Sequence, residues 1–261
     1  MKLTFLGVGA AMAPSTMWQS NMVLEKNGRK LLIDAGGDVR HSLKESFPEV
    51  HPGNISTEID AIYISHLHAD HIGGLEGIAL CSYFTPPRRK PVLFCDADLM
   101  DELWETSLKG GLETIEGKVA DLTDFFDCRP VKANGEFEWE GVLFYPVQTL
   151  HVMSGRKFQH SYGLTFADYQ GEGGRVFLTT DTQFCPRQLP KFYEQADVIF
   201  HDCETSKFPS NVHAHFNDLK TLNWEHKEKM WLYHYNSVTP EQNAVAEGFR
   251  GFVVKGQSFE L

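Results

Sequence analysis

The feature that most constrains the fold is a run of metal-binding side chains directly after a buried strand. Residues 61–64 are apolar and mostly β-branched or aromatic, which is typical of a strand buried on both faces. The run SHLHADH follows at once, at residues 65–71. Side chains two residues apart in an extended chain point the same way, so its first two histidines can hold one ion, while the aspartate and last histidine can face a second. Imidazole and carboxylate ligands suit zinc, manganese or iron. The predicted ligands are His66, His68, Asp70 and His71.

Strand and helix patterns alternate along the rest of the chain. Hairpin signals stand at Asn27-Gly28 and Glu140-Gly141, a Gly-rich turn at 171–174, and an acidic, irregular stretch at 112–135. In each half, meander strands precede strand–helix alternation, which predicts an α/β protein with two mixed sheets covered by helices, an αββα four-layer sandwich. No linker divides the chain, so we expect one domain over residues 1–261. The expected strands cover residues 2–6, 21–25, 30–33, 61–64, 91–94, 136–139, 142–147, 162–167, 175–179, 198–201 and 230–233, and the expected helices cover 39–47, 72–84, 96–108, 215–222 and 240–248.

Charge and cysteine content narrow the classes of function. The formal net charge is −11, and the basic residues cluster only at Arg88-Arg89-Lys90, so extended nucleic-acid binding is not expected. The sequence contains no run of about 18 apolar residues, so no membrane span is predicted. Five scattered cysteines without a CxxC pair favour a reducing, cytoplasmic compartment. The opening residues resemble a weak signal peptide, but alternation at 3–7 favours a first strand.

The HxHxDH run resembles the metallo-β-lactamase superfamily. In that family the later ligands follow successive strands, and His151, Asp181 and His234 follow the matching expected strands in the same order. The resemblance implies two divalent metal ions, most simply zinc, with manganese as the alternative. Such pairs suit phosphodiester hydrolysis and also serve lactams, thioesters or lactones, so the fold alone does not choose among them. Asp34 matches the family's aspartate that supports the ligands from behind. By the same resemblance His66, His68, His151 and Asp181 hold one ion, and Asp70, His71, His234 and the shared Asp181 hold the other.

Two further segments are similar to the ribonuclease Z branch of that superfamily. They are FLGVGAA at residues 5–11 and His201-Asp202-Cys203-Glu204. In that branch an acid and a histidine beyond the metals assist proton transfer, and here two histidines follow Asp202 at a matching distance. His213 is favoured by its place in the motif, with His215 left open as the proton donor. The candidate catalytic residues are therefore Asp70, Asp202, His213 and His215.

The ribonuclease also carries a long basic arm for tRNA, inserted between the second-half histidine and aspartate. Here His151 and Asp181 are 30 residues apart, which leaves no room for an arm and argues against tRNA processing. A longer stretch at 96–140 stands in its place. It is either an acidic surface elaboration or a lip or dimer surface that supplies aromatic rings for a base. The aromatic residues of this stretch considered for that role are Trp104, Phe125, Phe126 and Trp139.

The segments NVHAHFNDLKTL and KMWLYHYN, at residues 211–222 and 229–236, are most similar to the anti-Pycsar family of phages and bacteria. That family implies a cytoplasmic homodimer that hydrolyses 3′,5′-cyclic CMP and UMP, with tolerance for cyclic AMP and GMP, to 5′-monophosphates, and so removes an antiphage immune signal. The alternatives are a tRNA 3′-end endonuclease, a hydrolase of 2′,3′- or 1,2-cyclic phosphates, and a non-enzymatic metal-binding protein. The complete ligand set argues against the last.

Overall fold

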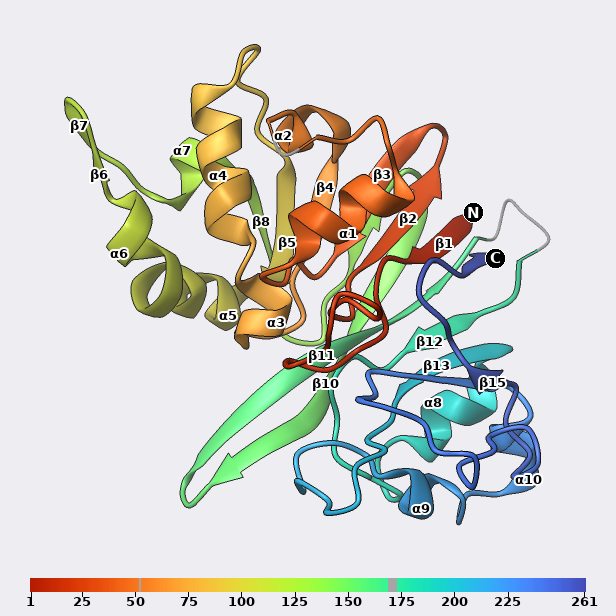
Figure 1. Cartoon of the computed structure of the whole chain (residues 1–261). Helices are drawn as coiled ribbons and strands as arrows, with labels where there is room; N and C mark the ends of the chain where they lie inside the picture. The colour runs from red at the N-terminus through yellow and green to blue at the C-terminus, as the bar shows by residue number, and fades with distance from the viewer. Residues whose placement is uncertain (52, 169–172) are drawn as a thin grey trace.

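The computed structural model describes residues 1–51, 53–168 and 173–261 (Figure 1). Two seven-stranded sheets account for most strands of this described part, and helices lie on their outer faces, as the predicted αββα sandwich requires. The first sheet runs in the order β16 (Ser258–Glu260), β1 (Lys2–Phe5), β2 (Met22–Lys26), β3 (Arg29–Ile33), β4 (Ala61–Tyr63), β5 (Val92–Asp96), β8 (Asp127–Val131). The second runs β15 (Gly251–Phe252), β14 (Met230–Tyr233), β13 (Val198–Asp202), β12 (Val176–Leu178), β11 (Lys157–Ala167), β10 (Val142–Ser154), β9 (Phe137–Trp139).

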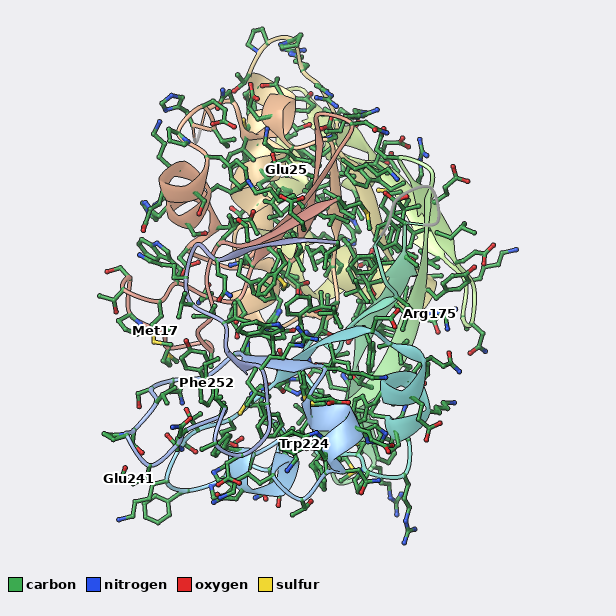
Figure 2. All side chains as sticks on the ribbon, turned by 90° about the vertical axis from the view of Figure 1, so that its right-hand side faces the viewer. Met17, Glu25, Arg175, Trp224, Glu241 and Phe252 are labelled. Carbon is green, nitrogen blue, oxygen red and sulfur yellow. The ribbon has the colours of Figure 1, made fainter. Side chains whose placement is uncertain are left out.

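The helices fall into two groups, one outside each sheet (Figure 1). Figure 2 shows the division from the side, with Glu25 in the first half and Trp224 and Phe252 in the second. The first group is α1 (Val39–Ser46), α2 (Ile55–Glu58), α3 (Ala69–Ile72), α4 (Leu75–Phe84), α5 (Ala97–Glu102), the π-helix η1 (Leu103–Leu108), α6 (Lys109–Leu112) and α7 (Leu122–Phe125), with a small ribbon of β6 (Thr114–Ile115) and β7 (Lys118–Val119). The second is α8 (Pro190–Gln195), α9 (Phe216–Leu219) and α10 (Trp224–Lys227).

Three apolar layers hold the sandwich together, one between the sheets and one under each helical group. The middle layer is aromatic, and Phe5 of the first sheet packs on Phe200 and Tyr233 of the second, with ring centroids 5.1 and 5.4 Å apart. Phe5 is fully buried, and removing such a ring typically costs about 3–5 kcal/mol. The strand expected at the N-terminus is confirmed as β1, with Leu3 and Phe5 facing this core.

Three predicted elements differ from the structure. Residues 240–248 form turns, because the side chains of Gln242 and Asn243 bind backbone groups of Thr239, Thr205 and Ala246 in place of helical hydrogen bonds. The helix expected at 72–84 is broken at Gly73-Gly74 into α3 and α4. The helix expected at 96–108 does begin with Asp96, which caps the amides of Asp98 and Leu99, but it continues through η1 and α6.

Two regions hold more structure than expected. The stretch 112–135 contains α7 and the edge strand β8, which pairs parallel with β5. Strands β10 and β11 form one long hairpin through residues expected to be loop, and Figure 1 shows it projecting beyond both sheets. The turn expected at 171–174 lies partly outside the described residues. No helix of the described chain is long and apolar enough to cross a membrane.

Candidate metal centre

The carboxyl ends of the parallel strands in both sheets converge on one place. In the first sheet, Ile33 is level with Tyr63, so the loops after β3 and β4 emerge side by side. The loop after β4 carries the run 65–71. Across the gap, the amide of Tyr162 on β11 donates to the carbonyl of Ser65 at 3.0 Å, which ties this loop to the second sheet. Strand ends of this kind are where open α/β sheets place their functional loops.

The second sheet delivers its side chains from separate positions. Parallel pairing puts Leu178 level with Phe200 and Asp202 level with Tyr233, so the ends of β12, β13 and β14 lie in a row. Asp181 and His234 follow the outer two of these ends. His151 was expected just after a strand, but it lies within β10, at a register shift between Leu150 and Val152. Such a bulge re-aims a side chain, and here it turns His151 into the site.

The structure brings all seven predicted ligands into two clusters that share Asp181. In the first cluster the Nε2 atoms of His66 and His151 lie 3.1 and 3.0 Å from Nδ1 of His68. Oδ2 of Asp181 lies 3.7 Å from His66 Nε2 and 3.5 Å from His151 Nε2. In the second cluster Nε2 of His71 and of His234 each lie 3.4 Å from Asp181. Asp70 completes it, 3.4 Å from His71 and 3.8 Å from His234.

The chemistry of these atoms fits divalent metal ions. His151 donates from Nδ1 to the carbonyl of Val212 at 2.8 Å, so its neutral ring turns a bare lone pair on Nε2 towards the other ligands. Among the described residues, Nε2 of His71, Oδ1 of Asp181 and both ring nitrogens of His234 are buried without a hydrogen-bond partner. Buried polar atoms are rarely left unpaired. Converging lone pairs and unpaired carboxylate oxygens are what a cation satisfies.

Burial keeps most of these imidazoles neutral. It lowers the pKa of His66 well below its usual value, lowers that of His151 to about 4, and lowers that of His234. Neutral imidazole is the form that binds a metal ion. These three rings therefore need no deprotonation before they serve as ligands.

The carboxylates give the same centre an excess of negative charge. Burial opposes ionisation of Asp181, but His234 and His71 hold the pKa of its carboxyl well below the usual value. Burial likewise opposes a charge on His71, yet the carboxylates of Asp181, Asp34 and Asp70 raise its pKa well above the ordinary value. Without a cation, a protonated ring must balance these acids. A divalent ion would take over that role.

Asp34 holds the first ligand loop from behind. Its Oδ2 accepts from Nδ1 of His71 at 2.7 Å and from the hydroxyl of Ser65 at 2.8 Å, and its Oδ1 accepts from the amide of Ser65. The bond between Nδ1 of His71 and Asp34 leaves Nε2 of His71 free to face an ion. Histidines that bind metals commonly donate their other ring N–H to a carboxylate in this way. Asp34 has φ 60° and His234 has φ 63°, strained conformations that cluster at functional sites.

The structure separates the two candidate proton donors. Nδ1 of His213 lies 2.8 Å from Oδ2 of Asp202, which also accepts from the amide of Thr182 at 2.9 Å. Burial lowers the pKa of His213, but the Asp202 carboxylate more than offsets this and raises it to about 10. Both ring nitrogens of His215 are engaged elsewhere: Nδ1 accepts from the amide of Asn217 and Nε2 donates to the carbonyl of Ser206. His215 thus caps α9, while His213 lies beside the second cluster.

Sequence reasoning missed the contacts that hold the loop of His213. The carboxylate of Glu204 accepts from the amide and hydroxyl of Ser210 and from the hydroxyl of Ser206. These contacts close the loop that contains Val212, whose carbonyl accepts the hydrogen bond from Nδ1 of His151. The motif at 201–204 drew attention to Glu204, but nothing in the pattern showed which loop it binds. A backbone acceptor such as Val212 leaves no sequence signal.

The aromatic residues considered for base binding lie mostly in the core. Phe125, Phe126 and Trp139 are buried, so that hypothesis is wrong for these three. Trp104 is half-buried against the core of the first half. The extra length at 96–140 is used mainly to build the edge of the first sheet and its covering helices.

Comparison with solved structures places the fold. The chain matches the metallo-β-lactamase fold protein YhfI of Bacillus subtilis with a TM-score of 0.73 at 16% identity, over 99% of each chain. It matches a diphosphatase of the PhnP family with a TM-score of 0.74 at 20% identity, over 100% of this chain and 96% of that one. The short form of human tRNase Z matches with a TM-score of 0.67 at 18% identity, over 100% and 99%. The protein therefore has the metallo-β-lactamase fold.

Sequence comparison gives the family. The family described as anti-Pycsar protein Apyc1 matches residues 1–259. An Apyc1 protein of Paenibacillus harenae is 37% identical over 237 residues, covering 90% of each chain. One from Bacillus phage vB_BveM-Goe7 is 34% identical over 251 residues, covering 92% of this chain and 91% of that protein. The chain belongs to the anti-Pycsar Apyc1 family.

Proposed function

We propose that this protein is a metal-dependent phosphodiesterase that hydrolyses 3′,5′-cyclic nucleotides to 5′-monophosphates and so removes an antiphage immune signal. The name of its relatives, anti-Pycsar protein, supports an action against Pycsar. The observation that carries this proposal is the pair of clusters joined by Asp181, whose buried ring nitrogens and carboxylate oxygens lack partners. The proposal includes two divalent ions, zinc or manganese. Its substrates are cyclic CMP and UMP, with cyclic AMP and GMP as further substrates, and the active form is a cytoplasmic homodimer.

The ligands divide as the two clusters do. His66, His68, His151 and Asp181 would hold one ion, and Asp70, His71, His234 and Asp181 the other. Ions held there would supply a water nucleophile at neutral pH and would neutralise charge on the oxygens of a phosphate. The contact of Asp34 with Nδ1 of His71, and that of the Val212 carbonyl with Nδ1 of His151, would keep the Nε2 atoms of both rings available to an ion.

His213 is the proton donor in this proposal. Opening a cyclic phosphate at its 3′ oxygen leaves an alkoxide, which needs a proton. Asp202 accepts from Nδ1 of His213 at 2.8 Å, so the ring presents its other nitrogen to the leaving group. The amide of Thr182 holds the carboxylate of Asp202 in place, and the carboxylate in turn orients the ring of His213. A pocket of about 240 Å³ opens beside His213 and is lined also by Gln183, Phe184 and Asn211.

A small substrate suits this chain better than tRNA. The net charge of −11 disfavours a long polyanion. The 30 residues from His151 to Asp181 include the last residues of β10, all of β11 and all of β12, which leaves too few residues for an arm. Counterion release on a tRNA would need clustered cations at the mouth of the site. A cyclic mononucleotide needs none beyond the bound ions.

The test is a parallel assay of metal-loaded protein on the four 3′,5′-cyclic nucleotides, a 2′,3′-cyclic nucleotide, a 1,2-cyclic phosphoribose and a precursor tRNA. We expect the 3′,5′ compounds to give 5′-monophosphates and tRNA to stay intact. Asp70→Ala, which removes a ligand from one cluster, serves as the inactive control. Cleavage of tRNA alone, or of the 2′,3′ or 1,2 compound alone, would keep the hydrolytic centre and replace the substrate. Inactivity on every compound at full metal occupancy would leave a metal-binding protein.

A further inference from the structure

A second cavity opens beside the metal centre and shares no lining residue with the pocket at His213. It has a volume of about 390 Å³, within the range of about 300–1,000 Å³ usual for small-ligand sites. We name it the β11 pocket, because Phe158, His160 and Tyr162 of β11 form one wall. The α5–η1 segment, with Asp98 and Glu102, forms the opposite wall. Figure 1 shows the hairpin passing beneath α3 and α5 in this region.

The β11 pocket adjoins the ligands directly. Leu67, which stands between His66 and His68 in the chain, lines the pocket. The amide of Tyr162 donates to the carbonyl of Ser65 at 3.0 Å, so the aromatic wall is fixed to the loop that carries the first ligands. His68 is the least buried ligand of the first cluster. A phosphate held at the clusters can therefore extend the rest of its molecule past His68 into this pocket.

The wall on β11 presents a row of aromatic rings. Phe158, His160 and Tyr162 are alternate residues of one strand, so their side chains share a face. The rings of Phe158 and His160 are nearly parallel, at 19°, with centroids 6.4 Å apart. Phe158 is 53% exposed although it is large and apolar. An exposed ring beside a cavity is a surface on which a nucleobase can stack, and such stacking tolerates different bases.

The opposite wall fixes the direction of the ligand. Asp98, Glu102 and Thr106 follow at four-residue spacing along α5 and η1, and all three line the pocket with hydrogen-bond acceptors. Lys157 also lines the pocket and lies 3.7 Å from Glu102, so it offsets part of this negative charge. Carboxylates repel a phosphate and accept hydrogen bonds from the amino groups or ring N–H groups of bases. Gln148 adds an amide that can donate or accept. The anionic end of a nucleotide thus belongs at the metal clusters and the base belongs in the β11 pocket.

We propose that the β11 pocket binds the base of the cyclic nucleotide, stacked on Phe158 and His160 and facing the acidic wall of Asp98 and Glu102. This inference rests on the proposed function. It explains how one site accepts several bases, because the ring stack carries no pattern of donors and acceptors.

The experiment compares steady-state kinetics on cyclic CMP and on a base-free analogue, the 3′,5′-cyclic phosphate of 1-deoxyribofuranose. Phe158→Ala and His160→Ala should each raise KM for cyclic CMP about 5- to 50-fold with kcat little changed, the pattern of a lost binding contact. KM for the base-free compound should not change. Phe158→Tyr, which keeps the ring, should retain the wild-type KM. Phe84→Ala is the matched control, since Phe84 is 57% exposed on α4, outside this pocket.

Three results would overturn the assignment. An unchanged KM for cyclic CMP in both alanine variants would place the base elsewhere, with the proposed function intact. An equal rise in KM for the base-free compound would show that the wall positions the sugar phosphate. Wild-type protein that hydrolyses no cyclic nucleotide would remove the proposed function itself, and the base site with it, before any variant is measured.

Discussion

The two halves of the metal centre are built in different ways. The first half supplies four candidate ligands from a single turn, residues 66–71 after β4. The second supplies His151, Asp181 and His234 from a bulge in β10 and from the loops after β12 and β14. The first four ligands, which we call the local set, depend on one strand end and its packing. The three ligands of the second half form the dispersed set. The dispersed set depends on the register of several strands, and a slip of one residue would turn a side chain to the other face.

Asp181 joins the two sets, so its loss gives the largest expected effect. Its carboxylate lies 3.4–3.7 Å from ring nitrogens of His71, His234, His151 and His66. We expect Asp181→Ala to bind less than one ion per chain and to lose turnover about 10⁴-fold, since several kcal/mol of charge stabilisation disappear. Elemental analysis and an assay measure both. The exposed Asp101→Ala is the control, and full metal content in Asp181→Ala would contradict the shared role.

The proposed proton donor, His213, lies on the dispersed side of the site and is expected to act without holding metal. His213→Ala is expected to slow turnover of a cyclic nucleotide about 10²-fold, a usual value for general acid catalysis, with metal content unchanged. Asp202→Asn should give part of the same loss, because it weakens the contact that orients the ring. An unchanged rate in His213→Ala together with an inactive His215→Ala would transfer the role to His215.

The local set is sensitive to the packing behind it. A Cβ on Gly36 would lie 2.1 Å from the carbonyl oxygen of Asp70. Gly36→Ala should therefore displace the ligand turn and weaken metal binding about 10–100-fold, as loss of supporting contacts does. Gly77→Ala is the matched control, because a Cβ on Gly77 would meet no atom within 4 Å, and in helix α4 it should stabilise by about 0.4–1 kcal/mol. Equal metal affinity in both variants, measured by competition with a chelating dye, would refute the packing argument.

The smallest effect is expected at His215, which the structure places in a structural role. His215→Ala removes the cap of α9 and should cost about 1 kcal/mol, or about 2–4 °C in melting temperature. Turnover of the folded protein should stay near wild type. Thermal unfolding followed by circular dichroism, with the assay run well below the transition, checks both parts.

The same contrast explains what could be predicted from the sequence. The spacing of ligand-type residues within 65–71 is enough to predict metal binding, and the buried strand before them is confirmed as β4. His151, Asp181 and His234 became candidates only through a family resemblance, since histidines and aspartates at strand ends are common. The bulge at His151 could not be seen, because it arises from pairing with β11. The roles of all these residues stay predictions, as does the single domain.

Other differences have equally local causes. The turns at 240–248 look helical in pattern, but Ala244 carries the one buried side chain among these residues, so packing gives the helix little support. His213 and His215 are two residues apart with similar flanks, and only the partners of their ring nitrogens distinguish them. The long β10–β11 hairpin was underestimated because residues 154–157 at its turn are polar or glycine and exposed.

The pairing of β16 with β1 has a consequence for synthesis. The outer neighbour of β1 in the first sheet is made of residues 258–260, while β1 itself is residues 2–5. At about 5–20 residues per second, roughly 13–50 s separate the translation of these two strands. During that time one edge of β1 is open to pairing with other chains. The first half of the sandwich is thus begun early on the ribosome but completed only after the second half has been made.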